Sequence, residues 1–210
     1  FPFLSTTSDV EFGENDQPTI FNPSARQTLY MDIYEPTGDI AAERPLIIFA
    51  FGGAFVVGSK TDGYIVELCE RYAKLGYVTA SIDYRLTPGL ILGATNEDAY
   101  LAVMKATHDM KAAIRFFRKS IDDGNTCKIS NDHIFVGGVS AGGFAALNCG
   151  YLDNDSEIPV VIQDDVPALG GIEGLSGNPG YSSEVAGVIN LCGALGDKNW
   201  MGTGDVPVVS

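Results

Sequence analysis

Residues 134–143, Ile-Phe-Val-Gly-Gly-Val-Ser-Ala-Gly-Gly, constrain the fold of this chain more than any other stretch. An apolar run rich in β-formers stops there at a Gly-x-Ser-x-Gly pattern, and an Ala- and Leu-rich segment follows at once. The pattern predicts a strand, a sharp turn and a helix. A serine in such a turn has a strained backbone, so the residues two before and two after it must lack side chains. Gly138 and Gly142 occupy those two positions.

The same turn predicts a reactive hydroxyl. It would place Ser140 at the N-terminus of a helix, where the helix dipole and free N–H groups favour developing negative charge. Gly-x-Ser-x-Gly also arises by chance in a chain with 25 glycines. The flanking strand and helix favour a nucleophile elbow over a structural glycine turn, so Ser140 is the predicted catalytic residue.

The composition narrows the class of protein. A chain of 210 residues suits one domain, and 45% hydrophobic with 19% charged residues is typical of a globular protein. No apolar run approaches the ~18 residues of a transmembrane helix, so no transmembrane span is expected. The net charge of −14 makes nucleic acid and anionic membranes poor partners.

The cysteines do not predict a metal site. None belongs to a Cys-x-x-Cys pattern and none has a histidine nearby, so a metal site is not expected. Up to two disulfides, in three connectivities, and four buried free thiols both remain open. The cysteines concerned are Cys69, Cys127, Cys149 and Cys192.

Hydrophobic periodicity predicts the remaining elements. Apolar residues alternate with polar ones over 29–34, which predicts a strand with one buried face. The run at 46–50 is apolar throughout, as in a strand buried on both faces of a parallel sheet. Further strands are predicted at 77–82, 185–192 and 206–210, and helices at 64–75, at 97–119 and from the elbow to about 151.

Strands that alternate with helices at this spacing predict an α/β fold with a mostly parallel central sheet and helices on both faces. We expect one domain over residues 1–210. Residues 1–27 are polar and are predicted to be an irregular N-terminal segment. Residues 153–183 are rich in proline and glycine, and we expect an irregular insertion that walls the active site.

A second glycine-rich segment precedes the elbow by about ninety residues. Residues 51–55, Phe-Gly-Gly-Ala-Phe, follow the buried strand at 46–50. Acyl transfer builds negative charge on a carbonyl oxygen, and backbone N–H groups can meet it only where side chains are absent. We assign an oxyanion hole to the N–H groups of Gly53, Ala54 and Ala141. The alternative is an ordinary glycine turn between a strand and a helix.

Charged residues follow the strand at 77–82, on the edge where Ser140 is expected. Charges tolerate burial when they are paired. Asp83 and Arg85 are therefore predicted to form a buried pair that holds loops together, with contact to substrate as the alternative.

A base for Ser140 is missing from the sequence. A serine nucleophile needs a base, usually a histidine oriented by an acid. His108 lies between apolar positions of the helix at 97–119 and is predicted to be a surface or packing residue. His133 begins the strand that leads to Ser140, so it should lie roughly 20 Å away at ~3.3 Å per residue. We expect neither histidine to act as the base.

Three segments together resemble the α/β-hydrolase superfamily, in particular carboxylesterase- and lipase-like secreted bacterial esterases. Residues 51–55 are similar to the esterase His-Gly-Gly-Gly-Phe, residues 81–86 contain Asp-Tyr-Arg-Leu, and residues 138–142 match the elbow. The resemblance covers about 29–210. It implies hydrolysis of a small-molecule or lipid ester through an acyl-enzyme on Ser140, without a cofactor, in a secreted or periplasmic protein.

The sequence departs from this family in two ways. Phe51 replaces the loop histidine, so the hydrogen bond that would anchor the loop is not expected. The family's acid follows a strand such as 206–210, and its histidine comes later. We therefore expect the acid and base from a C-terminal part beyond residue 210, with this stretch nearly inactive by itself. Asp197 is a weaker candidate acid, and a non-catalytic hydrolase-like binding module is the alternative.

Overall fold

Most strand pairs of the central sheet are parallel. The fold is seen in a computed structural model that describes residues 1, 3–19, 21–38 and 40–210. The strands in this part of the chain are β1 (Leu4–Asp16), β2 (Arg26–Pro36), β3 (Arg44–Ala50), β4 (Val78–Ile82), β5 (Ile129–Val139), β6 (Gly187–Leu191) and β7 (Val208–Val209). They form one sheet in the order β1-β2-β4-β3-β5-β6-β7. β3 to β7 pair in parallel, whereas β2 is antiparallel to both β1 and β4.

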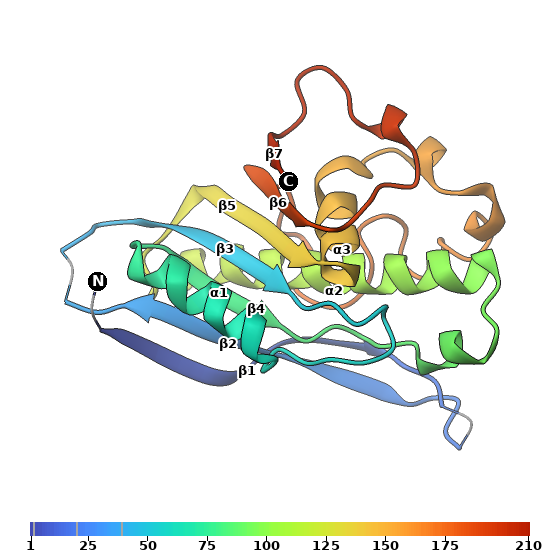
Figure 1. Cartoon of the computed structure of the whole chain (residues 1–210), viewed down its shortest axis with the longest axis horizontal. Helices are drawn as coiled ribbons and strands as arrows, with labels where there is room; N and C mark the ends of the chain where they lie inside the picture. The colour runs from blue at the N-terminus through green and yellow to red at the C-terminus, as the bar shows by residue number, and fades with distance from the viewer. Residues whose placement is uncertain (2, 20, 39) are drawn as a thin grey trace.

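Helices cover both faces of this sheet, as the sequence predicts. The helical segments are α1 (Gly63–Lys74), η1 (Pro88–Leu92), α2 (Asn96–Asp122), α3 (Ala141–Tyr151), η2 (Asp155–Glu157), η3 (Val160–Ile162) and η4 (Lys198–Trp200). In Figure 1, α1 lies in front of the sheet and α2 runs behind it. No helix among the described residues is both long enough and apolar enough to cross a membrane.

The core is built around β3. Residues 46–50 are all buried, because β3 lies between β4 and β5 and both faces of the sheet are covered there. A second, smaller apolar cluster joins α2 to the segment after α3. Its buried members are Met104, Leu152, Ile158, Ile162 and Val166. This cluster holds the irregular residues that follow α3 against the rest of the molecule.

The expectation that residues 1–27 are irregular is wrong. β1 (Leu4–Asp16) forms an antiparallel ladder with β2, from Leu4 opposite Pro36 to Asp16 opposite Arg26. Two register shifts, after Thr7 and after Glu11, interrupt the ladder. β1 is an edge strand with mostly exposed side chains, and its bulges break the period-two pattern. Backbone pairing rather than apolar alternation therefore defines this strand.

β2 is buried on both faces, not on one as the alternation predicts. Asp32 is buried, and its charge is paired there because its Oδ1 accepts a hydrogen bond from Lys60 Nζ at 2.6 Å. Asp9 on β1 also lies 2.9 Å from Lys60 Nζ. Burial opposes the charge of Lys60, but the hydrogen bonds to Asp32 and Asp9 outweigh it and raise the pKa of Lys60. This ion cluster ties β1 and β2 to the loop before α1.

Arg85 is buried in an ion pair, but its partner is not the predicted Asp83. Asp109 on α2 accepts from Arg85 Nε at 3.0 Å and from the Arg85 backbone N–H at 2.8 Å. Ser176 Oγ donates to the same carboxylate at 2.6 Å. Asp83 instead accepts from the Lys60 backbone N–H at 2.8 Å. Arg85 thus connects the end of β4, α2 and the insertion.

The described residues include all four cysteines, and none of them forms a disulfide. Cys69 and Cys149 are buried, Cys127 is half-buried and Cys192 is exposed. Burial raises the pKa of Cys69 and of Cys149 to about 12, so both remain protonated packing residues. The structure has free thiols rather than disulfides, but only two of the four are buried, so the expectation of four buried thiols is right only in part.

Breaking the buried Arg85–Asp109 pair should strongly destabilise the fold. Asp109→Asn keeps the shape but leaves the Arg85 guanidinium without its counter-charge, which costs about 3–5 kcal/mol. Urea unfolding measures this loss. Glu67→Gln is the control, because it breaks the exposed Arg71–Glu67 pair and should change stability little. Similar small losses in both variants would contradict the assignment.

Candidate active site

Ser140 lies in a strained turn between β5 and α3, as the sequence predicts. Its φ is 50° and its ψ is −115°, and its side chain is exposed. A Cβ added to Gly138 would lie 2.2 Å from the carbonyl carbon of Gly142, and one added to Gly142 would lie 2.1 Å from the Ala50 carbonyl oxygen. The two glycines are therefore required by backbone packing, as the elbow pattern demands.

The glycine-rich loop 51–55 lies beside this serine because β3 and β5 are adjacent parallel strands. Ala50 at the end of β3 is in register with Gly138 on β5, so the segments that follow them leave the same edge of the sheet. A Cβ added to Gly52 would lie 3.3 Å from Ser140 Cβ. The fold thus brings together two sequence segments about ninety residues apart.

The predicted oxyanion donors directly follow the two residues that meet here: Gly53 and Ala54 follow Gly52, and Ala141 follows Ser140. Gly53 and Ala54 have positive φ values of 121° and 52°. Within the described chain, neither of their N–H groups donates a hydrogen bond. Ala141 is the first residue of α3, so its N–H lacks an intrahelical acceptor. Their assignment as an oxyanion hole stays a prediction, with three unused backbone donors near Ser140.

Phe51 has no side-chain group that could anchor the loop 51–55 by a hydrogen bond. Aromatic packing of its ring anchors the loop instead. The ring of Phe51 is buried and stacks on Tyr84, with centroids 4.3 Å apart. The Tyr84 hydroxyl donates to the Phe51 carbonyl at 3.0 Å. A Cβ on Gly58 would lie 2.5 Å from the Phe51 ring, so the loop closes tightly over it. The segment 51–55 therefore has a well-defined position without a histidine.

Tyr64 on α1 is a site residue that the sequence does not reveal. Its hydroxyl oxygen accepts the Gly52 N–H at 2.7 Å. A Cβ added to Gly52 would lie 3.5 Å from this oxygen, so Tyr64, Gly52 and Ser140 meet at one point. Burial raises the pKa of Tyr64, which keeps it a neutral phenol with an O–H to donate. In the sequence, Tyr64 is one of several apolar residues at helical spacing, and nothing there distinguishes it as a site residue.

His108 is a packing residue, as predicted. It is fully buried on α2, and its Nε2 lies 2.8 Å from the Gly171 carbonyl oxygen. Burial, reinforced by the positive charge of Arg85, lowers the pKa of His108 to about 3. A Cβ on Gly174 would lie 2.3 Å from the ring, so the insertion packs directly on it. These contacts hold the His108 ring in the core.

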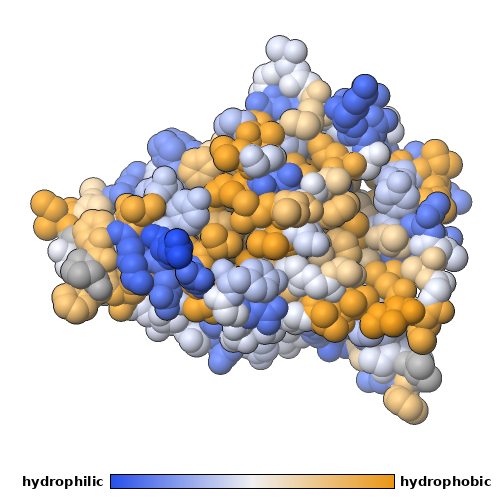
Figure 2. Space-filling view, viewed as in Figure 1, coloured by the Kyte–Doolittle hydropathy of each residue, from blue (hydrophilic) through white to orange (hydrophobic). Residues whose placement is uncertain are grey.

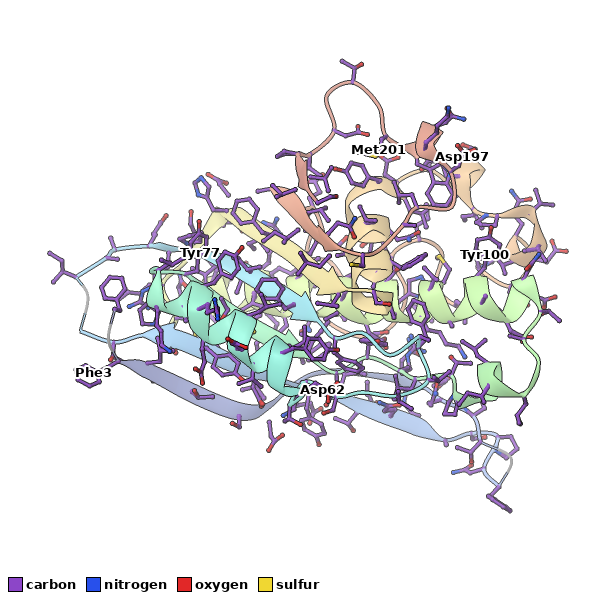
Figure 3. The ribbon with its side chains drawn as sticks, viewed as in Figure 1. Phe3, Asp62, Tyr77, Tyr100, Asp197 and Met201 are labelled. Carbon is purple, nitrogen blue, oxygen red and sulfur yellow. The ribbon has the colours of Figure 1, made fainter. Side chains whose placement is uncertain are left out.

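His133 and Asp197 also lie away from the elbow. His133 is exposed near the start of β5, with its Nδ1 3.0 Å from Ser130 Oγ. Asp197 caps η4, where its Oδ1 accepts the Asn199 N–H at 2.9 Å. Figure 3 shows Asp197 on the loop that follows β6, on the same side of the molecule as Tyr100. No described histidine or carboxylate therefore orients the Ser140 hydroxyl through a hydrogen bond.

A cavity of about 410 Å³ lies between the N-terminal part of α2, one side of α3, the insertion, and the segment from Leu195 to Trp200. The predicted insertion contributes Pro159 and Ile162 to its wall, and these residues are irregular apart from short single-turn helices. Phe144, one turn after Ser140, lines the cavity, whereas Ser140 does not. The cavity is thus next to the elbow and not at it.

A mostly parallel sheet with a strained serine between a strand and a helix defines an α/β-hydrolase. Residues 31–194 match the family described as BD-FAE, and the chain belongs to this family.

Individual relatives agree with this assignment. Esterase LipC of Mycobacterium tuberculosis is 34% identical over 137 residues, which are 62% of this chain and 30% of LipC. Carboxylesterase 20 of Arabidopsis thaliana is 24% identical over 171 residues, 74% of this chain and 46% of that protein. Esterase 2 of Thermogutta terrifontis phosphorylated by paraoxon has a similar fold, with a TM-score of 0.64 at 19% identity. That match covers 99% of this chain and 69% of the esterase. The chain therefore spans less than half of the two curated relatives.

Removing the Tyr64 hydroxyl should loosen the loop 51–55. Tyr64→Phe leaves the Gly52 N–H without its acceptor, which should cost about 1 kcal/mol locally and speed amide exchange at Gly52 roughly five-fold. NMR-detected hydrogen exchange measures this. Tyr30→Phe, at an exposed tyrosine on β2, is the control. Unchanged protection of Gly52 in Tyr64→Phe would refute the anchoring role.

His108 should make the fold sensitive to acid. The pKa of His108 is 6.5 in an unfolded chain but about 3 in the folded protein. Between these two pH values the unfolded chain binds a proton at His108 and the folded protein does not, so stability is lost as the pH falls from 6.5 toward 3. His108→Gln should therefore lose less stability than the wild type between pH 7 and about pH 5, by up to roughly 2 kcal/mol. Urea unfolding at both pH values tests this. His133→Gln, at the exposed histidine, should behave like the wild type, and equal losses in all three proteins would disprove the effect.

Proposed function

We propose that this chain carries the nucleophile and the oxyanion hole of a serine carboxylic-ester hydrolase. The observation that carries the proposal is the exposed, strained Ser140 beside Gly52, in a loop whose next two N–H groups, those of Gly53 and Ala54, are unused. Ser140 is held by its backbone N–H, which donates to the Leu191 carbonyl at 2.7 Å. Such a hydroxyl at a helix N-terminus favours nucleophilic attack.

In this mechanism Ser140 Oγ attacks the ester carbonyl carbon and loses its proton to a base. The tetrahedral oxyanion accepts hydrogen bonds from the N–H groups of Gly53, Ala54 and Ala141. The alcohol leaves with a proton, and the acyl group stays on Ser140. Water then hydrolyses the acyl-enzyme by the same route and releases the acid. Small-molecule or lipid esters are the substrates that we propose, in line with the relatives named as esterases.

We propose that the base and its acid come from sequence beyond residue 210. His108 is buried against Gly171 and His133 lies on the opposite end of β5, so neither supplies the base. A half-exposed apolar face on β5 and β6, which includes Phe135, Val139 and Ile189, supports a further covering segment. Figure 2 shows apolar side chains gathered across the middle of the visible face.

A non-catalytic binding module with a hydrolase fold is the second candidate. The absence of a histidine within reach of Ser140, among the described residues, is the observation that favours it. The two candidates differ in whether the natural protein activates Ser140.

A fluorophosphonate probe separates these candidates. Esterase 2 of Thermogutta terrifontis is phosphorylated by paraoxon, which makes organophosphorus reagents a suitable choice. We expect labelling of the natural protein at Ser140 and complete loss in Ser140→Ala, with Ser5→Ala on β1 as control. The 210-residue chain should hydrolyse esters about a million-fold more slowly than a protein with its base.

Intact mass spectrometry of the natural protein provides the second readout. We expect a mass above that of these 210 residues, or a companion chain. A folded natural protein that the probe does not label would favour the binding module.

A further inference from the structure

One peptide group of the glycine-rich loop is held from both sides by tyrosine hydroxyls. The peptide between Phe51 and Gly52 has one carbonyl oxygen and one N–H. The Tyr84 hydroxyl donates to the Phe51 carbonyl at 3.0 Å. The Tyr64 hydroxyl oxygen accepts the Gly52 N–H at 2.7 Å. Side chains therefore satisfy both hydrogen-bonding groups of this peptide and fix its plane at two opposite edges.

The two tyrosines come from separate elements, and each has a defined position. Tyr84 follows β4 and is 1% exposed, and its ring contacts the rings of Phe51 and Phe55 at centroid distances of 4.3 Å and 6.2 Å. Tyr64 lies in the first turn of α1. Burial raises the pKa of both tyrosines, so both remain neutral phenols. A strand end and a helix thus hold the same peptide.

The next peptide, between Gly52 and Gly53, has no backbone hydrogen bond of its own. In the part of the chain that the structure describes, no backbone N–H donates to the Gly52 carbonyl, and no backbone carbonyl accepts the Gly53 N–H. The Gly53 carbonyl beyond it accepts the N–H groups of Val56 at 2.9 Å and Val57 at 3.2 Å. The peptide that carries the proposed oxyanion donor therefore lies between two fixed neighbours.

Glycine on both sides makes this middle peptide dependent on those neighbours. Glycine adopts positive and negative φ values about equally readily, so Gly52 and Gly53 offer little resistance to rotation. The Phe51–Gly52 peptide fixes the position and the direction in which the chain enters Gly52. If that peptide were released, the Gly53 N–H would shift relative to Ser140. A displacement of about 1 Å in an active site can lower a reaction rate about 100-fold.

We propose that Tyr64 and Tyr84 are positioning residues of the oxyanion hole, which keep the Gly53 N–H where the oxyanion forms. Neither tyrosine touches the reacting atoms. The proposal rests on the proposed function for its link to catalysis, but the restraint on the loop exists without chemistry and can be measured without it.

Tyr64→Phe and Tyr84→Phe keep each ring and remove one hydrogen bond each. Acylation and deacylation both pass through an oxyanion, so in the natural protein we expect kcat for ester hydrolysis to fall about ten-fold or more while KM changes less than about two-fold. Tyr84→Phe should lower kcat more. The Phe51 carbonyl is buried, whereas Tyr64 is 42% exposed and water can replace its oxygen.

Tyr151→Phe is the matched control. Tyr151 is 2% exposed at the C-terminal end of α3, and its hydroxyl donates to the Val206 carbonyl at 2.8 Å. This variant loses the same kind of buried hydrogen bond as Tyr84→Phe, so urea unfolding should show similar losses of stability in both. Its kcat should stay close to the wild-type value. Equal losses of kcat in the two variants would overturn the proposal.

The variant with both Tyr64→Phe and Tyr84→Phe tests whether the two tyrosines act on one peptide. Because either substitution already releases that peptide, the loss of kcat in the double variant should be clearly smaller than the product of the two single losses. A loss equal to that product would contradict a shared peptide.

The amide ¹⁵N relaxation of Gly53 provides a readout that needs no catalysis. We expect a lower order parameter for Gly53 in Tyr64→Phe and in Tyr84→Phe than in the wild type, and no change in Tyr151→Phe. An unchanged order parameter, or an unchanged kcat, in both variants overturns the proposal and leaves the proposed function intact. A lower order parameter in a protein whose Ser140 is never labelled would keep the restraint and refute the proposed function.

Discussion

The candidate site depends on one backbone contact between the first turn of α3 and the end of β3. Gly142, in the first turn of α3, lies against the carbonyl of Ala50 so closely that a Cβ would approach it to 2.1 Å. This contact places the start of α3 beside the end of β3, and with it Ser140 beside the loop 51–55. Any side chain at Gly142 would push the two segments apart. The chemistry of the site therefore rests on the absence of two side chains, those of Gly138 and Gly142.

Buried charges hold the surrounding loops to this framework. Arg85 joins the end of β4 to Asp109 on α2 and to Ser176 in the insertion. Lys60 joins the loop before α1 to Asp32 on β2 and Asp9 on β1. Each cluster joins segments that are distant in sequence. These ion pairs therefore fix the positions of loops that contain few helices or strands.

The sequence predicts the central elements well, because their patterns are local. The apolar run of β3, the helical stripe of α2 and the elbow glycines each depend on neighbouring residues. β1 is not predicted, because its pairing with β2 depends on backbone hydrogen bonds and its bulges interrupt the alternation of apolar and polar residues. The partner of Arg85 is not predicted for another reason. A buried charge indicates that a counter-charge is nearby, but the sequence does not tell which acidic residue provides it. Tyr64 is missed because a hydroxyl on an amphipathic stripe carries no sign of its hydrogen-bond partner.

The sequence by itself determined the strand–turn–helix at Ser140, the glycine loop that precedes it and the lack of a suitable histidine, since all three are properties of short segments and of composition. Only the tertiary structure decided that Tyr64 meets Gly52, that Asp109 neutralises Arg85, and that Phe144, one turn after Ser140, lines an apolar cavity. These relations depend on strand order and helix packing, which bring distant segments within hydrogen-bond and van der Waals distance. Proximity of that kind leaves no periodic signal along the chain.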